Sequence, residues 1–290
     1  MVSIVSSAAR ELIEAAVVEL DHAGVDTPRL DAEVMLAEAT GRSRTDVMFG
    51  AIAIDAHARS RFDAMIGRRA RREPLAYIIG RKEFYSIEFH VTPAVLIPRP
   101  ETEVVVAAAL DFLAERARAR VLDLGTGTGA IALAIAANAT HVEVVASDVS
   151  IAGLKVAACN TDRQGLRDRV EFRHADCFDP LDGAGSLGRF DLIVSNPPYV
   201  RDDAIAGLQP EIARWEPRAA LAGGPDGLAL YRRIARDSCT HSEADSRVIF
   251  ELGDRQAAAV TSILRDSGYT GITTIPDLAG TLRVISARRP

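Results

Sequence analysis

Hydrophobic side chains recur at helical spacing in the first eighty residues. Ile13, Ala16, Val17 and Leu20 fall at i, i+3, i+4 and i+7, and Gly24 is placed to end that helix. The same spacing, with a proline or an aspartate near each start, predicts three more helices, over residues 28–41, 55–72 and 74–80. Together these segments predict a small helical bundle.

The pattern changes after residue 81. Phe84, Ile87, Phe89 and Val91 lie in an alternating, aromatic-rich run over residues 82–97, which is typical of a β-hairpin. We expect this hairpin to link two domains. The predicted parts are a helical domain over residues 1–81, a hairpin linker over 82–98 and a larger domain over 99–290.

Strand and helix patterns alternate through the rest of the chain. Near-continuous apolar runs predict strands over residues 120–124, 142–146, 190–194 and 248–252, and shorter ones over 273–275 and 283–287. Helices are predicted over residues 101–118, 130–137, 151–164, 227–239 and 255–267. Strands that are apolar on both faces belong in a largely parallel sheet covered by helices, so the fold class is α/β.

Composition supports a folded protein with a substantial core. The chain has 290 residues, 48% of them hydrophobic, and a mean hydropathy of +0.07. No run approaches the roughly 18 apolar residues of a membrane span, and charged residues interrupt the N-terminus early, at Arg10, Glu11 and Glu14. We therefore expect a cytoplasmic protein with no membrane partner. The net charge of −6 argues against a main affinity for a nucleic-acid backbone.

The cysteines give no sign of a disulfide framework or of a metal site. Cys159, Cys177 and Cys239 are widely spaced, which suits reduced thiols. His174 and Cys177 are three residues apart, but no second pair with ligand spacing follows. We expect no metal.

A glycine-rich turn follows the first strand of the larger domain. Such a turn between strand and helix receives a nucleotide in open α/β sheets. Gly125, Gly127 and Ala130 satisfy the dinucleotide pattern, so the turn alone suits a nicotinamide cofactor as well as S-adenosylmethionine. Asp123 favours S-adenosylmethionine, because a carboxylate there suits its cationic amino-acid end better than a pyrophosphate. A capping role for Asp123 at the strand end is the alternative.

Acidic residues also end the next two strands. Asp148 lies about 20 residues beyond the turn, where a carboxylate can accept bonds from both ribose hydroxyls. Asp176 is placed to accept from the adenine amino group, and Cys177 to line the edge of the ring. Ordinary strand-end turns are the alternative for both acids. Three carboxylates in order at strand ends nevertheless fit a bound nucleotide.

The tetrad Asn196-Pro197-Pro198-Tyr199, directly after the predicted strand 190–194, suits chemistry on a planar nitrogen. An amide nitrogen is a poor nucleophile, because its lone pair is delocalised into the carbonyl. The Asn196 side-chain oxygen and the Pro197 carbonyl can hold its two N–H bonds, the prolines restrict the backbone, and Tyr199 offers a flat wall. By itself the tetrad leaves an amide, adenine or cytosine open as acceptor, and a proline-rich strand exit is the simpler alternative.

Taken together, the chain resembles the release factor glutamine methyltransferases of the HemK/PrmC type over nearly its whole length. Besides the glycine turn and the tetrad, the resemblance rests on residues 73–80, 83–85, 96–103, 216–218 and 224–228. The stretch Pro-Arg-Pro-Glu-Thr-Glu at 98–103 distinguishes this family from the similar ribosomal-protein glutamine methyltransferases. Three positions depart from the family pattern: Ser86 replaces a glycine, Cys177 an aromatic residue, and Thr281-Leu282 a more polar pair.

The resemblance implies a Rossmann-like class I methyltransferase with a mostly parallel seven-stranded sheet. It implies that S-adenosylmethionine is the methyl donor, S-adenosylhomocysteine the product, and the glutamine of the Gly-Gly-Gln motif of class I release factors the acceptor, in translation termination. The donor-binding residues that the resemblance implies are Gly125, Thr126, Gly127, Thr128, Gly129, Asp148 and Asn196. The strand-end argument above adds Asp123, Asp176 and Cys177. The implied glutamine pocket is Asn196, Pro197, Pro198 and Tyr199, with Asn196, Pro197 and Tyr199 catalytic.

Other functions share parts of this pattern. An amino-methyltransferase acting on adenine or cytosine would use the same tetrad, but the acidic net charge and the 98–103 stretch argue against it. A nicotinamide-dependent oxidoreductase or a non-catalytic S-adenosylmethionine-binding regulator would need the glycine turn but not the tetrad. The helical domain shows no evident chemistry, so we expect it to dock the protein substrate; a stabilising appendage is the alternative. The arginines at 68, 69, 71 and 72 suit an acidic surface of the partner, although a solvated helix face is the more common meaning of such a cluster.

Overall fold

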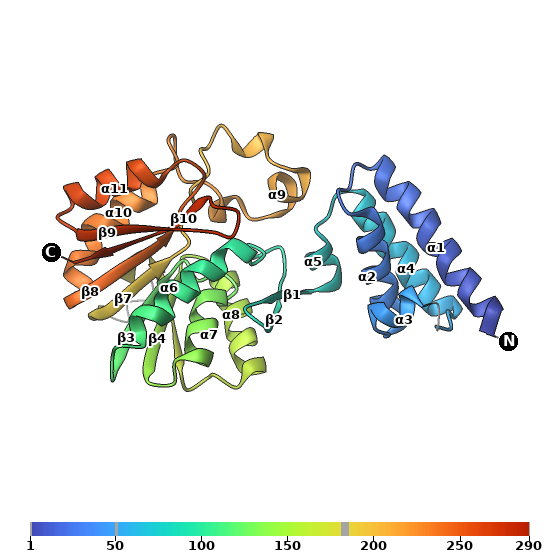
Figure 1. Cartoon of the computed structure of the whole chain (residues 1–290), viewed down its shortest axis with the longest axis horizontal. Helices are drawn as coiled ribbons and strands as arrows, with labels where there is room; N and C mark the ends of the chain where they lie inside the picture. Colours follow the sequence, from blue (N-terminus) through green and yellow to red (C-terminus); the bar gives the residue numbers. More distant parts are fainter. Residues whose placement is uncertain (1, 50–51, 181–185, 290) are drawn as a thin grey trace. The chain divides into compact units, whose positions relative to one another are not determined.

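The computed structural model describes residues 2–49, 52–180 and 186–289 (Figure 1). The chain divides into two compact units, Met1–Gly80 with Gln209–Trp215, and Arg81–Leu208 with Glu216–Pro290. The sequence did not indicate that a segment from the second half of the chain belongs with the first unit. None of the described helices is both long enough and apolar enough to cross a membrane.

The first unit is a helical bundle, as predicted. Leu20, Met35, Leu36 and Phe62 are at most 1% exposed and form the centre of its core. A short helix was missed, because its signal is only a capping box in which Ser43 caps the helix. The helices are α1 (Val2–His22), α2 (Pro28–Thr40), α3 (Arg44–Met48), α4 (Ala56–Ala70), α5 (Leu75–Ile79) and α9 (Pro210–Trp215).

The arginines near the end of α4 are used inside this unit. Arg69, whose side chain is 8% exposed, donates to Asp31 and to Glu211 of α9, both at 2.7 Å. Arg72 forms a two-pronged pair with the same Glu211, and Arg68 has its own acidic partner in the loop after α4. The expectation that these arginines face a partner protein is therefore wrong for Arg69 and Arg72, whose side chains are largely buried in their ion pairs. For Arg68 and Arg71 it stays a prediction.

A tight hairpin begins the second unit. Strands β1 (Arg81–Phe84) and β2 (Ile87–His90) are joined by Tyr85 and Ser86, both with positive φ, of 51° and 60°. Two-residue turns of this kind favour glycine, which explains why Ser86 stands out against the family pattern. The hairpin is shorter than predicted, because residues 91–99 contain no strand.

An eight-stranded sheet forms the centre of the second unit. Its order is β6-β5-β4-β3-β7-β8-β10-β9, and the five strands from β5 to β8 are parallel. The six strands predicted by range are present, as is a strand that ends at Asp176, and the two-residue β6 adds an antiparallel edge. The strands are β3 (Ala119–Leu124), β4 (Val142–Asp148), β5 (Val170–Asp176), β6 (Asp179–Pro180), β7 (Phe190–Ser195), β8 (Ser242–Glu251), β9 (Thr270–Pro276) and β10 (Leu282–Arg288).

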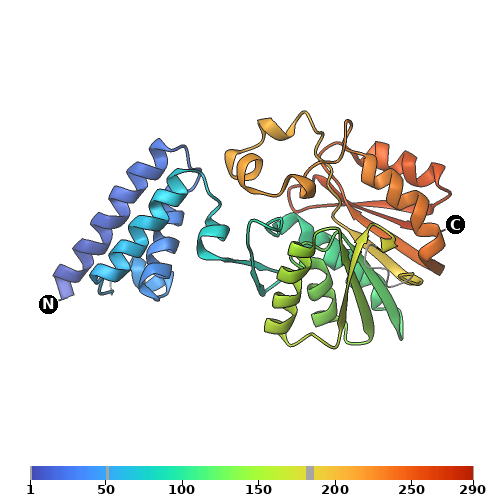
Figure 2. The ribbon, with the colours of Figure 1, turned by 180° about the vertical axis from the view of Figure 1, so that it is seen from behind.

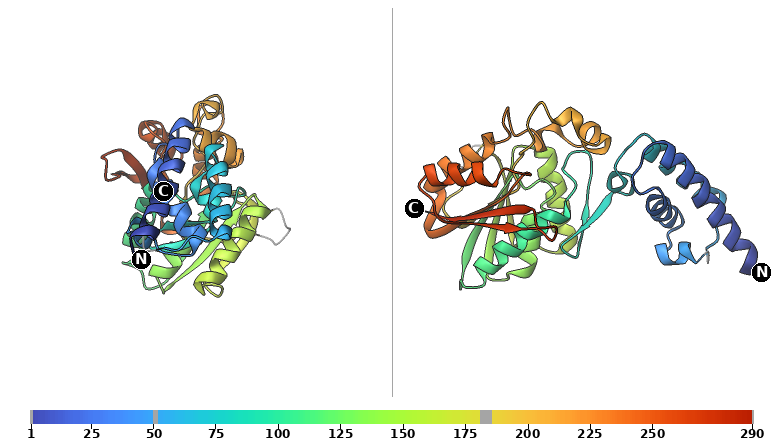
Figure 3. Two further views of the ribbon diagram at one scale, coloured as in Figure 1. Left: turned by 90° about the vertical axis from the view of Figure 1, so that its right-hand side faces the viewer. Right: turned by 45° about the horizontal axis from the view of Figure 1, so that its top comes forward.

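Helices cover both faces of this sheet. The group α6, α7 and α8 lies on one face and the pair α10 and α11 on the other (Figure 1, Figure 3); α7 and α8 are in the foreground of Figure 2. The first helix ends at Leu113, five residues before its predicted end. Their bounds are α6 (Glu103–Leu113), α7 (Ala130–Asn138), α8 (Ile151–Gln164), α10 (Ala229–Ser238) and α11 (Ala257–Asp266).

The strand order reverses between β3 and β7. From β3 the chain proceeds to β4 and β5 on one side, and it returns to β7 and β8 on the other. Leu124 pairs with Ser195 at the ends of these two central strands, and the Ser195 hydroxyl donates to the Leu124 carbonyl at 2.7 Å. In open α/β sheets the crevice beyond such a reversal is where ligands bind.

Candidate active site

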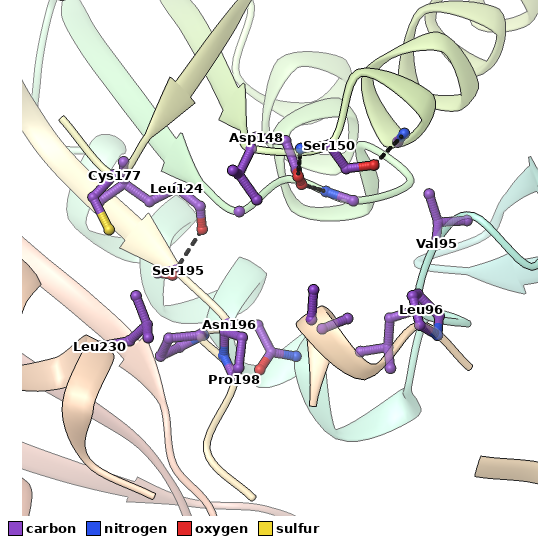
Figure 4. Close-up of a pocket in the computed structure, with 18 of the residues that line it drawn as sticks. Val95, Leu96, Leu124, Asp148, Ser150, Cys177, Ser195, Asn196, Pro198 and Leu230 are labelled. Carbon is purple, nitrogen blue, oxygen red and sulfur yellow. Dashed lines mark hydrogen bonds between the residues drawn. The ribbon is translucent and has the colours of Figure 1, made fainter. Parts of the chain in front are cut away.

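A cavity of about 280 Å³ opens at the carboxyl ends of β3, β4, β5 and β7, within the second unit. Figure 4 shows Asp148 on one side of it and Asn196 and Pro198 on the other. Its lining comes from the glycine turn, the ends of β4 and β5, the tetrad and the segment after β2. The loop that follows α9 and the helix α10 complete it. Among the sequence-predicted residues it includes Gly125, Gly127, Asp148, Asp176, Cys177, Asn196, Pro197 and Pro198.

The glycine turn forms a cradle of bare backbone. Gly125 and Gly127 have φ of 74° and 54°, in the left-handed region that favours glycine. A Cβ at either position would meet no protein atom within 4 Å, so the space above them is open to a ligand. Gly129 differs, because a Cβ there would lie 3.1 Å from Leu133 Cδ1. It is needed for packing of the turn against α7.

Asp148 ties β4 to the glycine turn. Its Oδ2 accepts from the Gly127 backbone N–H and its Oδ1 from the Ser150 N–H, each at 2.8 Å. A carboxylate oxygen has more than one lone pair, so each can accept a further bond from a ligand hydroxyl. Asp148 therefore both shapes the cradle and is available to a ribose.

Asp123 lies behind the turn and is not part of the cavity lining. It is 1% exposed, and its Oδ2 accepts from the Thr126 hydroxyl at 2.7 Å and the Ala132 N–H at 3.2 Å. Its Oδ1 is buried with no hydrogen-bond partner among the described residues. Burial raises the pKa of Asp123 to about 7. A cationic group that reached Oδ1 would favour the ionised form, so the site fits the charge of S-adenosylmethionine.

Asp176 and Cys177 lie at the end of β5. Both line the cavity, but Asp176 Oδ1 accepts from Arg233 of α10 at 2.7 Å, a partner that the sequence did not indicate. Burial raises the pKa of Cys177 to about 11, so it is a neutral thiol near pH 7. Cys177 therefore contributes a small apolar surface and no nucleophile.

Side-chain hydrogen bonds hold the tetrad from behind. Asn196 Nδ2 donates to the Thr102 hydroxyl at 3.2 Å, and that hydroxyl donates to Glu251 Oε2 at 2.5 Å. Tyr199 donates its hydroxyl to Glu251 Oε1 at 3.3 Å, and burial and Glu251 raise the pKa of Tyr199. Glu251 is 1% exposed at the end of β8, and burial raises its pKa to about 6. This network leaves Asn196 Oδ1 without a partner among the described residues.

The tetrad backbone is held by two later loops. The Gln256 side-chain amide donates to the Tyr199 carbonyl at 3.0 Å. A Cβ at Gly223 would lie 2.8 Å from both the Pro198 carbonyl oxygen and the Tyr199 Cα, so only glycine allows this close approach. The backbone of the tetrad is thus fixed at the edge of the cavity.

The Pro-Arg-Pro-Glu-Thr-Glu stretch supports the same region. Arg99 pairs at 2.6 Å with Glu216, whose side chain is 1% exposed, and Thr102 carries the contact to Glu251. Glu103 accepts from the backbone of the β1–β2 turn at 2.8 Å. Three side chains of one short motif therefore hold three separate segments of the second unit.

Comparison with known proteins identifies the family. Residues 11–80 match the model of the PrmC N-terminal domain, and residues 103–212 match that of the methyltransferase small domain. A release factor glutamine methyltransferase of Cereibacter sphaeroides is 39% identical over 97% of this chain and 99% of its own length. One of Agrobacterium fabrum is 40% identical over 93% of each chain. The chain belongs to the release factor glutamine methyltransferase family.

Fold similarity extends beyond this family. A 16S rRNA methyltransferase of T. thermophilus, solved in complex with AdoMet and guanosine, covers 72% of this chain and 50% of its own with a TM-score of 0.52 and 18% identity. At that identity the likeness concerns the fold alone. The predicted Rossmann-like methyltransferase fold is confirmed, and this release factor glutamine methyltransferase family member is an enzyme.

The sequence did not indicate Thr102 and Glu251, the two residues linked to Asn196. Thr102 lies inside the 98–103 stretch, which indicates the family but no role for Thr102, and Glu251 is the one charged residue in the predicted strand 248–252. A lone acid in an apolar run was the available signal for Glu251. Of the predicted residues, those outside the cavity lining are Asp123, Thr126, Thr128, Gly129 and Tyr199. Their proposed roles, like those of the lining residues, stay predictions.

Proposed function

We propose that this protein transfers a methyl group from S-adenosylmethionine to the side-chain nitrogen, N5, of the glutamine in the Gly-Gly-Gln motif of class I release factors. The observation that carries the proposal is that two acceptor oxygens of the tetrad have no hydrogen-bond partner in the part of the chain that the structure describes. Asn196 Oδ1 and the Pro197 carbonyl oxygen have no hydrogen-bond partner among the described residues, although both residues line the cavity. Two free acceptors suit the two N–H bonds of a primary amide.

The opposite side of the cavity would hold the methyl donor. Gly125 and Gly127 offer close approach to backbone, Asp148 can accept from ribose hydroxyls, and Asp123 suits a cationic group. When bound, S-adenosylmethionine supplies an electrophilic methyl group on a positively charged sulfur. The acidic side chains of the site therefore match the charge of the donor.

The tetrad would orient the acceptor. Asn196 Oδ1 and the Pro197 carbonyl accept the two N–H bonds and thereby hold the amide nitrogen in one orientation. The nitrogen gains positive charge as it is methylated, and these two oxygens stabilise that charge. The charged amide is acidic enough to lose its proton to water or a nearby carbonyl, so no strong base is needed. Catalysis would rest on positioning and electrostatics.

An assay with labelled S-adenosylmethionine tests this function against its rivals. The protein is incubated with a class I release factor, with DNA, with RNA, or with no acceptor. We expect label on the release factor only. Label on nucleic acid would establish the amino-methyltransferase alternative instead, and donor binding without transfer to any acceptor would indicate a regulator.

We also propose that the first unit docks the release factor. None of the residues described for this unit lines the cavity, and its Phe49 is 79% exposed. Phe49→Ala is expected to raise KM for intact release factor and to leave KM for a short Gly-Gly-Gln peptide unchanged. Val18→Ala, at a residue that is 57% exposed on α1, is the matched control. An unchanged KM for the intact substrate would remove Phe49 from the docking surface.

A further inference from the structure

Asn196 is connected to a buried carboxylate that lies outside the cavity lining. The connection runs from Asn196 Nδ2 to Thr102 Oγ1 at 3.2 Å, and from that hydroxyl to Glu251 Oε2 at 2.5 Å. Ser195, the last residue of β7, pairs with Phe250 of β8, and the residues that follow these two in the sequence are Asn196 and Glu251. The sheet register therefore places the carboxylate beside the tetrad.

The ionised state of Glu251 determines the direction of both hydrogen bonds between Asn196, Thr102 and Glu251. An ionised carboxylate only accepts, so the single proton of the Thr102 hydroxyl is donated to Glu251. The Thr102 oxygen can then only accept from Asn196, which must present its Nδ2. The Asn196 Oδ1 is left for the cavity, where an acceptor is required.

We propose that Glu251 is a positioning residue, which acts through the Thr102 hydroxyl to keep the side-chain oxygen of Asn196 directed at the substrate amide. This inference rests on the proposed function, because it assigns Asn196 the role of accepting the substrate N–H. Glu251 itself does not line the cavity and touches no reacting atom.

The arrangement fails when Glu251 becomes a donor. A protonated Glu251, or a glutamine in its place, can donate to the Thr102 oxygen, and the Thr102 proton is then free for Asn196 Oδ1. The Asn196 side-chain amide would then turn over, so that its NH2 group and not Oδ1 faces the substrate amide. Two hydrogen-bond donors would face each other, and the substrate nitrogen would no longer be held in one orientation.

The surroundings of Glu251 explain when it ionises. The Thr102 and Tyr199 hydroxyls donate to its carboxylate, while the Tyr231 hydroxyl donates to its backbone carbonyl at 2.7 Å. Arg283 on β10 lowers the pKa of Glu251 and Glu101 raises it, but burial has the largest effect and raises it to about 6. The carboxyl is ionised near neutral pH and becomes protonated as the pH falls through 6.

Burial of the Glu251 carboxylate costs hydration free energy, and packing of the core does not require an acid at this position. A carboxylate that is 1% exposed loses its hydration, and an apolar residue would suit this position, because the three residues before it in β8 are buried and apolar. Buried acids with raised pKa values cluster at functional sites. A role in fixing the orientation of the Asn196 side-chain amide would account for a buried acid at this position.

The test uses the full chain, a Gly-Gly-Gln peptide and four substitutions. Glu251→Gln and Thr102→Val are each expected to lower kcat about 10- to 100-fold, the effect of losing a hydrogen bond to a charged group. The KM for the peptide and the Kd for S-adenosylmethionine should change far less. Thr102→Ser, which keeps the hydroxyl, should retain most activity. Glu243→Gln, at an exposed residue of the same strand, is the matched control and should leave kcat unchanged.

Two readouts separate positioning from a general structural effect. In the wild type, kcat should fall as the pH drops below about 6, and this acid limb should disappear in Thr102→Val, because the link is already cut. Adding Glu251→Gln to Thr102→Val should have little further effect on kcat, because both changes break one chain of bonds.

The outcomes distinguish this inference from the proposed function. A wild-type protein that does not methylate the glutamine removes both. An active wild type with full kcat in Glu251→Gln, or with multiplicative losses in the double variant, overturns the inference alone. If Glu251→Gln does not fold, the decision rests on Thr102. In that case a large difference in kcat between Thr102→Val and Thr102→Ser, with the acid limb lost only in Thr102→Val, supports the proposal, and equal kcat values overturn it.

Discussion

The two sides of the cavity differ in the groups that form them, which are mainly backbone on the side proposed for the donor and mainly side chains on the side proposed for the acceptor. On the donor side, backbone at Gly125 and Gly127 forms the cradle, and the Asp148 carboxylate is held by backbone N–H groups. On the acceptor side, side chains hold other side chains, from Asn196 through Thr102 to Glu251. The donor side therefore depends on chain geometry, while the acceptor side depends on a few exact chemical groups.

The difference also concerns distance along the chain. The Gly127–Asp148 bond joins residues 21 apart, whereas Asn196–Thr102 and Thr102–Glu251 join residues 94 and 149 apart. The proposed donor cradle is thus assembled within one strand-turn-helix-strand unit. The proposed amide clamp brings together the segment before α6 and the ends of β7 and β8. We expect variants on the two sides to affect different steps.

The largest effect is expected on the acceptor side. Asn196→Ala should lower kcat on the order of 10²–10³-fold, by analogy with the loss of one oxyanion-hole donor. Its affinity for S-adenosylmethionine, measured by calorimetry, should change much less. Near-normal turnover in this variant would remove Asn196 from the clamp and break the distinction between the two sides.

Loss of Asp148 should weaken donor binding instead. Asp148→Ala should raise the Kd for S-adenosylmethionine about 10- to 100-fold, because it removes hydrogen bonds to a charged acceptor. With the donor saturating, kcat should recover much of its wild-type value. Glu143→Ala, on the same strand and with an 83% exposed side chain, is the control. An unchanged Kd in Asp148→Ala would contradict its assignment to the ribose.

A methyl group on the cradle should have a smaller effect of the same kind. Gly127→Ala and Gly165→Ala both place alanine at positive φ with no atom near the new Cβ, so each should cost about 1–2 kcal/mol of stability. Only Gly127→Ala should also raise the Kd for S-adenosylmethionine, by about tenfold for a loss of about 1.4 kcal/mol. Thermal unfolding and calorimetry measure the two effects separately. Equal Kd values for S-adenosylmethionine in Gly127→Ala and Gly165→Ala would show that the donor does not approach Gly127.

The pH dependence of donor binding should report Asp123. Burial raises the pKa of this acid to about 7, and only the ionised form attracts a cation. The affinity for S-adenosylmethionine should therefore fall with decreasing pH, by about fourfold between pH 8 and 6.5 for one ionisation near 7. Asp123→Asn should bind more weakly at pH 8 and lose this dependence. A wild-type affinity that is constant over this range would dissociate Asp123 from the donor.

What the sequence predicted follows the same division. The four longer or proline-started helices of the first unit, six strands of the sheet and the glycine turn were predicted by range, because period and local turn chemistry specify them. The excursion of Gln209–Trp215 into the first unit was not, since its anchor is the pairing of Glu211 with Arg69 and Arg72, well over a hundred residues away. The short α3 was missed because one capping box is a weak signal.

The proposed clamp was only half predictable. Asn196 and the Pro197 carbonyl were predicted for it from the chemistry that an amide nitrogen requires, and that role stays a prediction. Thr102 and Glu251 were not, because no local pattern shows that the residue before α6 meets the end of β8. Asp176 was predicted at the cavity, but its partner Arg233 lies 57 residues further on. Side chains that meet across the sheet are the part that needed the structure.

Mass spectrometry of the modified substrate tests the central claim most directly. A class I release factor is incubated with the protein and S-adenosylmethionine, and its peptides are fragmented to locate the added mass. We predict a single methyl group on the side-chain nitrogen of the Gly-Gly-Gln glutamine, and none when that glutamine is replaced by alanine. A methyl group on any other residue, with that glutamine unmodified, would contradict the account.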